Sequence, residues 1–417
     1  MRVLHFLFVF LFLVCLFTQS ISKLCVLGIM YLLVKNGKLQ DKIYNPFNIL
    51  CVTCISYLCY YQPLGGVFLE DISVTTQVLI TLCLFAVFLG MFVVSRKKIT
   101  PIDIGNRCAN FWIVFIVGAL PTMVAIYLFG NMLNMSGEEM LETKEKMSVP
   151  FLGQFAYWLP TSIIVACKKN NTKYIIISLI ASLYVALLSV TKTGMLMACL
   201  FFAIGVTTFK PNIMKHKITL LLKKYAIVWM PVLMLSYFMY NNSIRHEASS
   251  GDSMEYLELS GSPVIQRTDN VAQGMFLNYL YYCSPWSNLD YNVRLNHERG
   301  YGKNTFGQFA HLLRIDEKRV PKMNPTFLNT HTFITDFYID FGYVGAIIAS
   351  FLLGCLIFYF YKKYGISNDP LLIGFYVLIA YATFMMFFSN HFVNGYLLNY
   401  FITLVGFSYF LRKSKVK

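Results

Sequence analysis

The chain has 417 residues, of which 57% are hydrophobic and only 13% charged, and its formal net charge is +15. Soluble domains usually carry about 25% charged residues, so this composition excludes a chain built from ordinary soluble domains. The apolar residues fall in blocks of roughly 15–23, the length that crosses a hydrocarbon core of about 30 Å. The predicted fold is therefore all-α integral membrane, a polytopic helical bundle of about 12 transmembrane helices.

Along the chain we expect a membrane bundle, a long polar loop and a second group of spans. Residues 1–240 are predicted to form about nine spans, residues 241–336 a large outer loop, and residues 337–417 about three spans. We expect the first apolar block to stay uncleaved, because further spans follow it at once. The expected spans lie near residues 3–17, 22–34, 47–61, 72–94, 109–130, 151–167, 174–190, 195–209, 225–240, 337–361, 371–388 and 396–411.

Basic residues are concentrated in short runs that flank the apolar blocks. Cytoplasmic loops of membrane proteins are enriched in lysine and arginine, so these runs predict that both termini are cytoplasmic and that the 241–336 loop is outside. The same distribution argues against nucleic-acid binding. Within the loop, residues 271–282 have helical apolar spacing and are expected to lie on the membrane surface. The runs are Arg96-Lys97-Lys98, Lys168-Lys169, the stretch 210–224, Lys362-Lys363 and the tail from Arg412.

Several catalytic and cofactor motifs are absent from the sequence. It contains no G-x-x-x-x-G-K-[ST] loop, no H-E-x-x-H and no G-x-S-x-G. It also lacks a D-x-D pair, a common way to hold a divalent metal through carboxylates. Cys51 and Cys54 form a C-x-x-C inside an apolar block without a second pair, which indicates core packing rather than a zinc or redox site. We expect neither a metal nor a cofactor.

Candidate phosphate-binding cations lie on the predicted outer side. Lys192 occupies a short turn, 191–194, between two apolar spans. The simpler interpretation is a lysine that snorkels to the lipid head groups, and the functional one is a cation that holds a lipid-linked phosphate. The planar fork of arginine suits phosphate oxygens. Any single loop arginine is more simply a solvated charge paired with an acid, but at least one is expected to bind phosphate. These arginines are Arg267, Arg294, Arg299 and Arg314.

Carboxylates and histidines near the outer surface are candidates for acid–base chemistry. Asp336 and Asp340 are four residues apart at the mouth of the tenth span, so they share one helix face. Carboxylates there also stabilise a helix N-terminus without any catalytic role. His297 and His311 lie in the loop and titrate near neutral pH, although each is more simply an ordinary loop histidine. His391 occupies another outer turn and is a candidate for lining the same cavity.

The end of the loop carries a distinctive pattern. Residues 329–333 read N-T-H-T-F, and residues 337–345 read F-Y-I-D-F-G-Y-V-G. This order resembles the O-antigen polymerase family (Wzy, oligosaccharide repeat-unit polymerases), in which a threonine–aromatic pair precedes an aromatic run ending in D-F-G-x-x-G. Residues 281–288 and 302–306 also resemble segments of this family, but more loosely. The 191–194 turn resembles the family's [ST]-R-T turn, with lysine where arginine is common, so the charge is kept and the bidentate fork is lost.

The similarity covers mainly residues 260–360 and the 191–194 turn, and His331 falls at a variable position of the pattern. The resemblance implies a GT-C-like glycosyltransferase of the bacterial inner membrane, with the large loop in the periplasm. Such an enzyme joins undecaprenyl-pyrophosphate-linked oligosaccharide repeats into O-antigen, without a metal. The implied partners are these lipid-linked oligosaccharides, membrane lipid and a chain-length regulator protein.

In that reaction the lipid pyrophosphate leaves and a sugar hydroxyl attacks, so the enzyme needs cations, a base and sugar-binding surfaces. The candidate cations are Lys192 and the loop arginines. The base is expected among Asp336, Asp340, His311 and His297, with no order between them. Aromatic side chains stack on the apolar faces of sugars, and the candidates for this role are Tyr281, Tyr282 and Trp286.

Two alternatives stay open. An O-antigen ligase has a similar topology and moves the glycan onto lipid A–core, although the D-F-G-x-x-G stretch favours a polymerase. A flippase for lipid-linked oligosaccharides belongs to another class and would place charges within many spans. The predicted spans here are nearly free of charge, and the polar residues are concentrated outside them.

Overall fold

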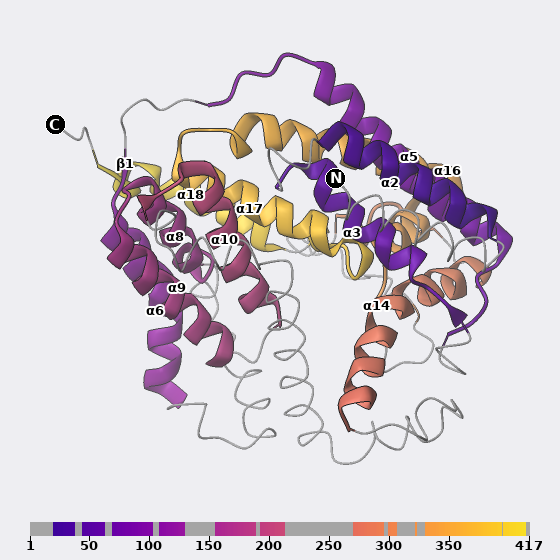
Figure 1. The fold of residues 1–417 in the computed structure, drawn as a ribbon, viewed down its shortest axis with the longest axis horizontal. Helices are drawn as coiled ribbons and strands as arrows, with labels where there is room; N and C mark the ends of the chain where they lie inside the picture. The colour runs from indigo at the N-terminus through magenta and orange to yellow at the C-terminus, as the bar shows by residue number, and fades with distance from the viewer. Residues whose placement is uncertain are drawn as a thin grey trace.

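The computed structural model describes residues 20–37, 44–62, 69–102, 108–129, 155–188, 192–212, 270–295, 299–306, 322, 330–393 and 395–413. Within these residues the chain is almost entirely helical (Figure 1). The eleven α-helices are α2 (Ile21–Gly37), α3 (Pro46–Leu58), α5 (Val74–Arg96), α6 (Phe111–Phe129), α8 (Trp158–Lys168), α9 (Thr172–Leu188), α10 (Lys192–Phe209), α14 (Asn270–Arg294), α16 (Phe333–Phe360), α17 (Pro370–Phe384) and α18 (Gly395–Leu411). The two strands, β1 (Cys108–Ala109) and β2 (Arg412–Lys413), have two residues each.

The predicted all-α membrane architecture is confirmed in outline. Ten of the twelve predicted spans are helices, and the other two, 3–17 and 225–240, lie outside the described residues. Among the described residues, four helical segments are long and apolar enough to cross a membrane, which suggests a multi-pass protein; they are Val74–Arg96, Phe111–Leu128, Phe333–Gly365 and Pro370–Phe387. The total of twelve spans stays a prediction.

Helix α17 lies at the centre of the bundle. It contacts α3 and α16 on one side and α8 and α10 on the other, so it separates two groups of helices (Figure 1). Every residue from Pro370 to Thr383 is buried. A helix that is apolar on all sides is suited to such a position, because no part of its surface has to meet water. Its start is defined by Asp369, whose side chain accepts a hydrogen bond from the Leu371 amide, and by Pro370 at the first helical position.

The most extensive helix contact joins α5 and α16, and two glycines make it possible. A Cβ added at Gly90 would lie 2.1 Å from the Phe351 carbonyl oxygen, and one at Gly354 would lie 2.2 Å from the Val87 carbonyl oxygen. The two backbones therefore touch with no room for a side chain between them. Within a membrane the hydrophobic effect does not drive helices together, so close van der Waals packing at small residues is a main source of their association.

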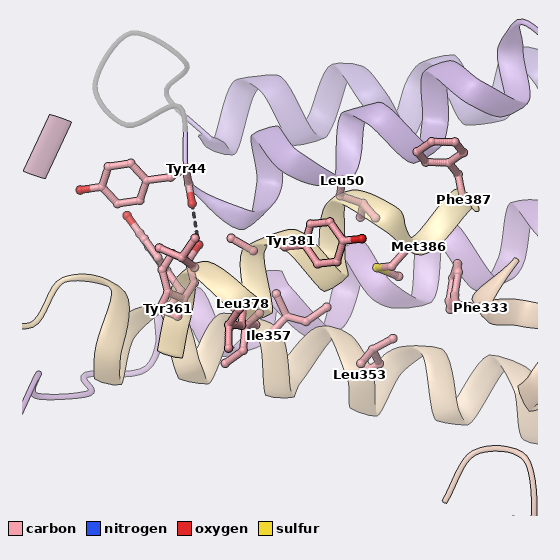
Figure 2. Close-up of a cluster of buried hydrophobic side chains, with 14 of the residues drawn as sticks. Tyr44, Leu50, Phe333, Leu353, Ile357, Tyr361, Leu378, Tyr381, Met386 and Phe387 are labelled. Carbon is pink, nitrogen blue, oxygen red and sulfur yellow. Dashed lines mark hydrogen bonds between the residues drawn. The ribbon is translucent and has the colours of Figure 1, made fainter. Parts of the chain in front are cut away.

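Buried side chains extend this contact toward the centre of the bundle. Leu50 of α3, Leu353 and Ile357 of α16 and Leu378 of α17 belong to one cluster (Figure 2). Close packing is again the source of stability, because each buried aliphatic side chain makes many weak dispersion contacts.

Segments with basic residues meet at the end of the bundle where α16 finishes. The Lys362 ammonium donates hydrogen bonds of 2.6 Å to the carbonyls of Ser95 and of Lys97. Strand β1 pairs antiparallel with β2. The Lys362 hydrogen bonds join the turn after α16 to the loop after α5, and the strand pair joins that loop to the segment after α18. All three segments therefore lie together. The sequence assigns all three to one side of the membrane, and the structure brings them to one end; the side itself stays a prediction.

The large predicted loop contains a longer helix than expected. Helix α14 extends from Asn270 to Arg294, beyond the predicted 271–282, and α16 begins at Phe333, inside the predicted 241–336 loop. The part of α14 from Cys283 to Asp290 is buried, and the helix packs on α3, α5 and α16. This later part of the helix is therefore held against the bundle, while the position of residues 271–282 on the membrane surface stays a prediction.

The glycine contact between α5 and α16 can be tested by Gly354→Leu. We expect this change to lower stability by about 1–3 kcal/mol, the usual cost of overpacking, because the new side chain meets the α5 backbone. Gly28→Leu is the matched control, since nothing lies within 4 Å of a Cβ at Gly28. Thermal unfolding of the purified protein in detergent measures both, and equal melting temperatures for the two variants would contradict the contact.

Candidate functional site

A polar stripe on α14 holds the chain just before α16. Ser284, Asn288 and Asn292 are spaced by four residues and therefore share one helix face. The Asn288 amide donates a 2.7 Å hydrogen bond to the Thr330 carbonyl, and the Ser284 and Thr330 hydroxyls are 3.1 Å apart. The Asn292 side chain donates to the Lys322 carbonyl at 2.7 Å and accepts from its amide at 3.0 Å. The stripe thus fixes the backbone on both sides of residues 323–329.

Acidic and basic side chains hold the C-terminal end of α14 against the start of α5. The buried carboxylate of Asp290 accepts hydrogen bonds from the Ser73 amide at 3.0 Å and from its hydroxyl at 2.6 Å. Arg294 forms ion pairs with Asp290, at 2.7 Å, and with Glu70. Arg294 was predicted as a phosphate-binding residue. In the structure its charge is already matched by two carboxylates.

Asp340 organises a turn formed by residues 299–306. Its carboxylate is almost completely buried, and both oxygens accept from the Asn304 amide, at 3.1 and 3.0 Å, while one also accepts from the Thr305 amide at 2.6 Å. Gly300 is required beside it, because an added Cβ would lie 2.2 Å from a carboxylate oxygen. With both oxygens accepting backbone hydrogen bonds, Asp340 positions the turn, and its prediction as a general base stays a prediction.

The helix geometry of α16 is interrupted just after Asp340. Gly342 has φ +72° and ψ −166°, a left-handed conformation that glycine adopts without strain. The Arg299 guanidinium packs on this glycine, 2.9 Å from where a Cβ would be, and donates a 3.1 Å hydrogen bond to the Tyr338 carbonyl. It also lies over the Tyr338 ring, 5.2 Å from its centre. Arg299 is thus a predicted cation that the structure holds at the mouth of α16.

His331 and Asp336 form a buried histidine–carboxylate pair at the start of α16. The distance from His331 Nε2 to Asp336 Oδ1 is 3.3 Å. Their side chains are 20% and 5% exposed, so the pair is largely shielded from water. Asp336 was predicted as a catalytic candidate, whereas His331 was set aside because of its variable position in the family pattern. The polar stripe on α14, which holds Thr330, is the sequence signal that points to His331.

His391 lies close to this pair. Burial, and to a smaller extent the nearby His331, lower the pKa of His391 to about 4. Its ring meets that of Tyr381, with centres 5.0 Å apart. The Tyr381 hydroxyl donates to Thr193 Oγ1 at 3.4 Å, next to Lys192, the first residue of α10. The predicted outer turns at 191–194 and 389–391 therefore meet the start of α16.

Eight buried side-chain polar atoms in this region have no hydrogen-bond partner among the described residues. Buried polar groups are nearly always paired, and an unpaired one costs about 1–3 kcal/mol. Such a concentration is typical of a site that binds a polar ligand or ordered water. The atoms are the two amide atoms of Asn304 and of Asn390, Thr305 Oγ1, His331 Nδ1, Asp336 Oδ2 and Tyr396 Oη. We call these six residues together with His391 the polar cluster.

A cavity of about 590 Å³ adjoins the polar cluster. Thr305 and Asn390 line one end of it, and Phe337 and Phe341 of α16 follow on its wall. The remainder of the lining is apolar. The cavity therefore combines a polar end beside His331 and Asp336 with a long apolar body.

The predicted aromatic residues differ in their surroundings. Trp286 is fully buried; its indole N–H donates to Ser56 Oγ at 3.0 Å, and its ring packs edge-on against Tyr57. Neither face of this ring is open to a sugar in this conformation. Tyr282 is 39% exposed and stacks on Phe387, while Tyr281 is partly buried.

Four predicted site residues, Arg267, His297, His311 and Arg314, lie outside the described residues, and only the backbone of Lys192 is described. Within the described part of the chain, no group of three or more His, Cys, Asp or Glu side chains is placed to hold a metal ion.

Comparison of the chain with protein-family models, with curated proteins and with solved structures finds no match.

The role of Asp340 can be tested by Asp340→Asn. We expect the turn 299–306 to open more easily by about 1–2 kcal/mol, because charge-assisted hydrogen bonds to backbone amides are replaced by weaker ones. Amide hydrogen exchange at Asn304 and Thr305 should then be roughly 10-fold faster. Asp71→Asn removes the same charge at an exposed position and should leave exchange there unchanged. Slow exchange in both variants would rule out Asp340 as the anchor.

The buried state of His391 predicts a dependence of stability on pH. Its folded pKa of about 4 lies below the ordinary value of 6.5, so between these values the unfolded chain binds more protons and stability falls as pH decreases. At pH 5 this amounts to about 2 kcal/mol. Thermal unfolding at pH 7.5 and pH 5 should show a smaller loss for His391→Gln than for the unchanged protein and for a control, His216→Gln, in the stretch 210–224 that is predicted to be cytoplasmic. An equal loss in all three would contradict the prediction.

Proposed function

We propose that this chain polymerises undecaprenyl-pyrophosphate-linked oligosaccharide repeat units into O-antigen on the periplasmic face of the bacterial inner membrane. The observation that carries the proposal is the His331–Asp336 pair beside an apolar cavity. An acid–base pair at such a position suits a reaction between a sugar hydroxyl and a lipid-linked donor. The resemblance of residues 329–345 to the polymerase family supports the same reaction.

His331 is the proposed general base. A proton on Nε2 is shared with Asp336 Oδ1, and this tautomer leaves the lone pair of Nδ1, which has no partner in the described structure, available to a ligand. The acceptor sugar hydroxyl gives its proton to Nδ1 while its oxygen attacks the anomeric carbon of the donor. Asp336 orients the imidazole and stabilises its positive charge as the proton arrives. Groups in this arrangement typically contribute about 10²–10⁴-fold to a rate.

The bond that breaks joins the anomeric carbon to the pyrophosphate of the donor lipid. Negative charge develops on the departing oxygen, and fixed cations stabilise it without a metal. Arg299 has the better-defined position, at the mouth of α16, and its single described hydrogen bond leaves most of its donors for phosphate oxygens. Lys192, at the start of α10, is the second proposed cation. Arg294 is a weaker candidate because two carboxylates already bind it.

The remaining polar groups position the acceptor. Tyr396 Oη and the side-chain amide of Asn304 are buried and without partners among the described residues, so each offers a hydrogen bond to a sugar hydroxyl. His391, neutral at physiological pH, is proposed as an acceptor or donor for another hydroxyl and not as a charged group. Holding two lipid-anchored substrates in one place is itself a large part of catalysis.

The proposal is tested in a strain that lacks this gene, complemented with variants and examined by gel electrophoresis of lipopolysaccharide. His331→Asn and Asp336→Asn are expected to leave core carrying a single repeat, because polymerisation falls by at least about 10²-fold. His216→Gln and Asp71→Asn are matched controls that should restore the full ladder, with protein levels compared by immunoblot.

Other patterns on the gel would contradict the polymerase assignment. Bare core in the strain without the gene would indicate a ligase or a flippase, since a ligase attaches repeats to core and a flippase supplies them for that step. An unchanged ladder in that strain would remove the O-antigen assignment. A full ladder with His331→Asn would remove His331 from the mechanism.

A further inference from the structure

The cavity beside the polar cluster follows one face of α16. Its wall includes Phe337, Phe341, Gly345, Ala349 and Leu353, which recur every four residues and so form one stripe along the helix. With Leu356 at the far end, the stripe extends over roughly 25–30 Å. Near the middle of the stripe Ala349 has only a methyl side chain, and a Cβ added at Gly345 would meet the Phe341 side chain at 2.2 Å. Phe392 and Leu398 face it from the other side.

The two ends of the cavity differ in chemistry. At the end near the polar cluster, Asn390 is 1% exposed and both of its side-chain amide atoms lack a partner in the described structure. The Thr305 hydroxyl, also on the lining, is buried and equally without a partner. A buried amide that bonds to nothing is costly, so this end is built for a ligand with hydrogen-bonding groups. Beyond these residues the lining is hydrocarbon only.

We infer that the cavity seats the prenyl chain of a lipid-linked substrate, with its phosphate end at Thr305 and Asn390. The inference rests on the proposed function and adds to it the place where the lipid binds. A linear, methyl-branched chain matches an apolar lining that follows one helix and has a single polar end, whereas a phospholipid would bring two chains and a head group that needs water.

The position of the cavity supports this occupant. Phe337 directly follows Asp336, and Asn390 directly precedes His391, so a head group at the polar end lies beside the proposed base. Arg299 packs on Gly342, next to Phe341 of the cavity wall, and supplies a cation close to a phosphate bound there. The cavity and the polar cluster therefore form one continuous amphiphilic site.

The test uses the full-length protein in nanodiscs of phosphatidylethanolamine and phosphatidylglycerol, with a diazirine-tagged polyprenyl phosphate as photoreactive probe. Cross-linked peptides should map to α16 and to the segment that carries Phe392. Ala349→Trp fills the hollow and should reduce labelling at least fivefold. Val344→Trp is the matched control, since Val344 is on the same helix, 68% exposed and not part of the lining; labelling should be unchanged.

A second variant separates loss of binding from loss of folding. Asn390→Leu should also reduce labelling, while its melting temperature should stay the same or rise, because an unpaired buried amide is removed. Full labelling of the Asn390→Leu variant would overturn the role of Asn390. Equal labelling of the same peptides by a diazirine-tagged phosphatidylethanolamine would overturn the inference, since the cavity would then be an ordinary lipid contact.

Failure of the inference and failure of the proposed function give different results. If Ala349→Trp loses labelling but still supports a full lipopolysaccharide ladder, the cavity does not hold the substrate and the inference falls, while the polymerase assignment stands. If labelling depends on Ala349 but the strain without the gene keeps its full ladder, the prenyl site stands and the O-antigen function falls.

Discussion

The close contact between α5 and α16 is the constraint on which the rest of the structure depends. Gly90 and Gly354 bring two backbones together without any side chain between them. Inside a membrane the hydrophobic effect cannot hold the two helices together in place of this contact, because the lipid tails around them are as apolar as their side chains. It fixes α16, and α16 carries at one end the two carboxylates Asp336 and Asp340 and along its length the wall of the cavity.

The start of α16 shows how a loop acquires a defined site on a membrane bundle. Three segments distant in sequence are bound there by backbone hydrogen bonds from buried side chains: α14 holds residues 322 and 330, and Asp340 holds the turn 299–306. Each such bond uses a polar side chain to satisfy a main-chain group that water does not reach. The side-chain amide of Asn390 and the hydroxyl of Tyr396, which have no hydrogen-bond partner within the described part of the chain, then stand out against these satisfied groups.

Hydropathy and length predicted the helices well, because a membrane span is a local property of about 20 residues. Asp336 lies in the first turn of a helix, as the sequence predicted. Contacts across long sequence separations could not be predicted in this way. Arg294 pairs with Glu70, more than 200 residues away, and Trp286 packs against Tyr57 instead of facing solvent. A loop aromatic that binds sugar and one that fills a core have the same sequence pattern. The contact between His331 and Asp336 is likewise recognisable only once α16 is known to begin at Phe333.

The central position of α17 has a consequence for biosynthesis. It follows α3, α8, α10 and α16 along the chain, yet it contacts helices of both groups. Until α17 enters the bilayer, the faces of α3, α8 and α10 that it covers lack their packing partner. The polar cluster draws His331 from the residues just before α16 and His391 from the residues just after α17. Insertion of α17 therefore both joins the two groups and brings the cluster together.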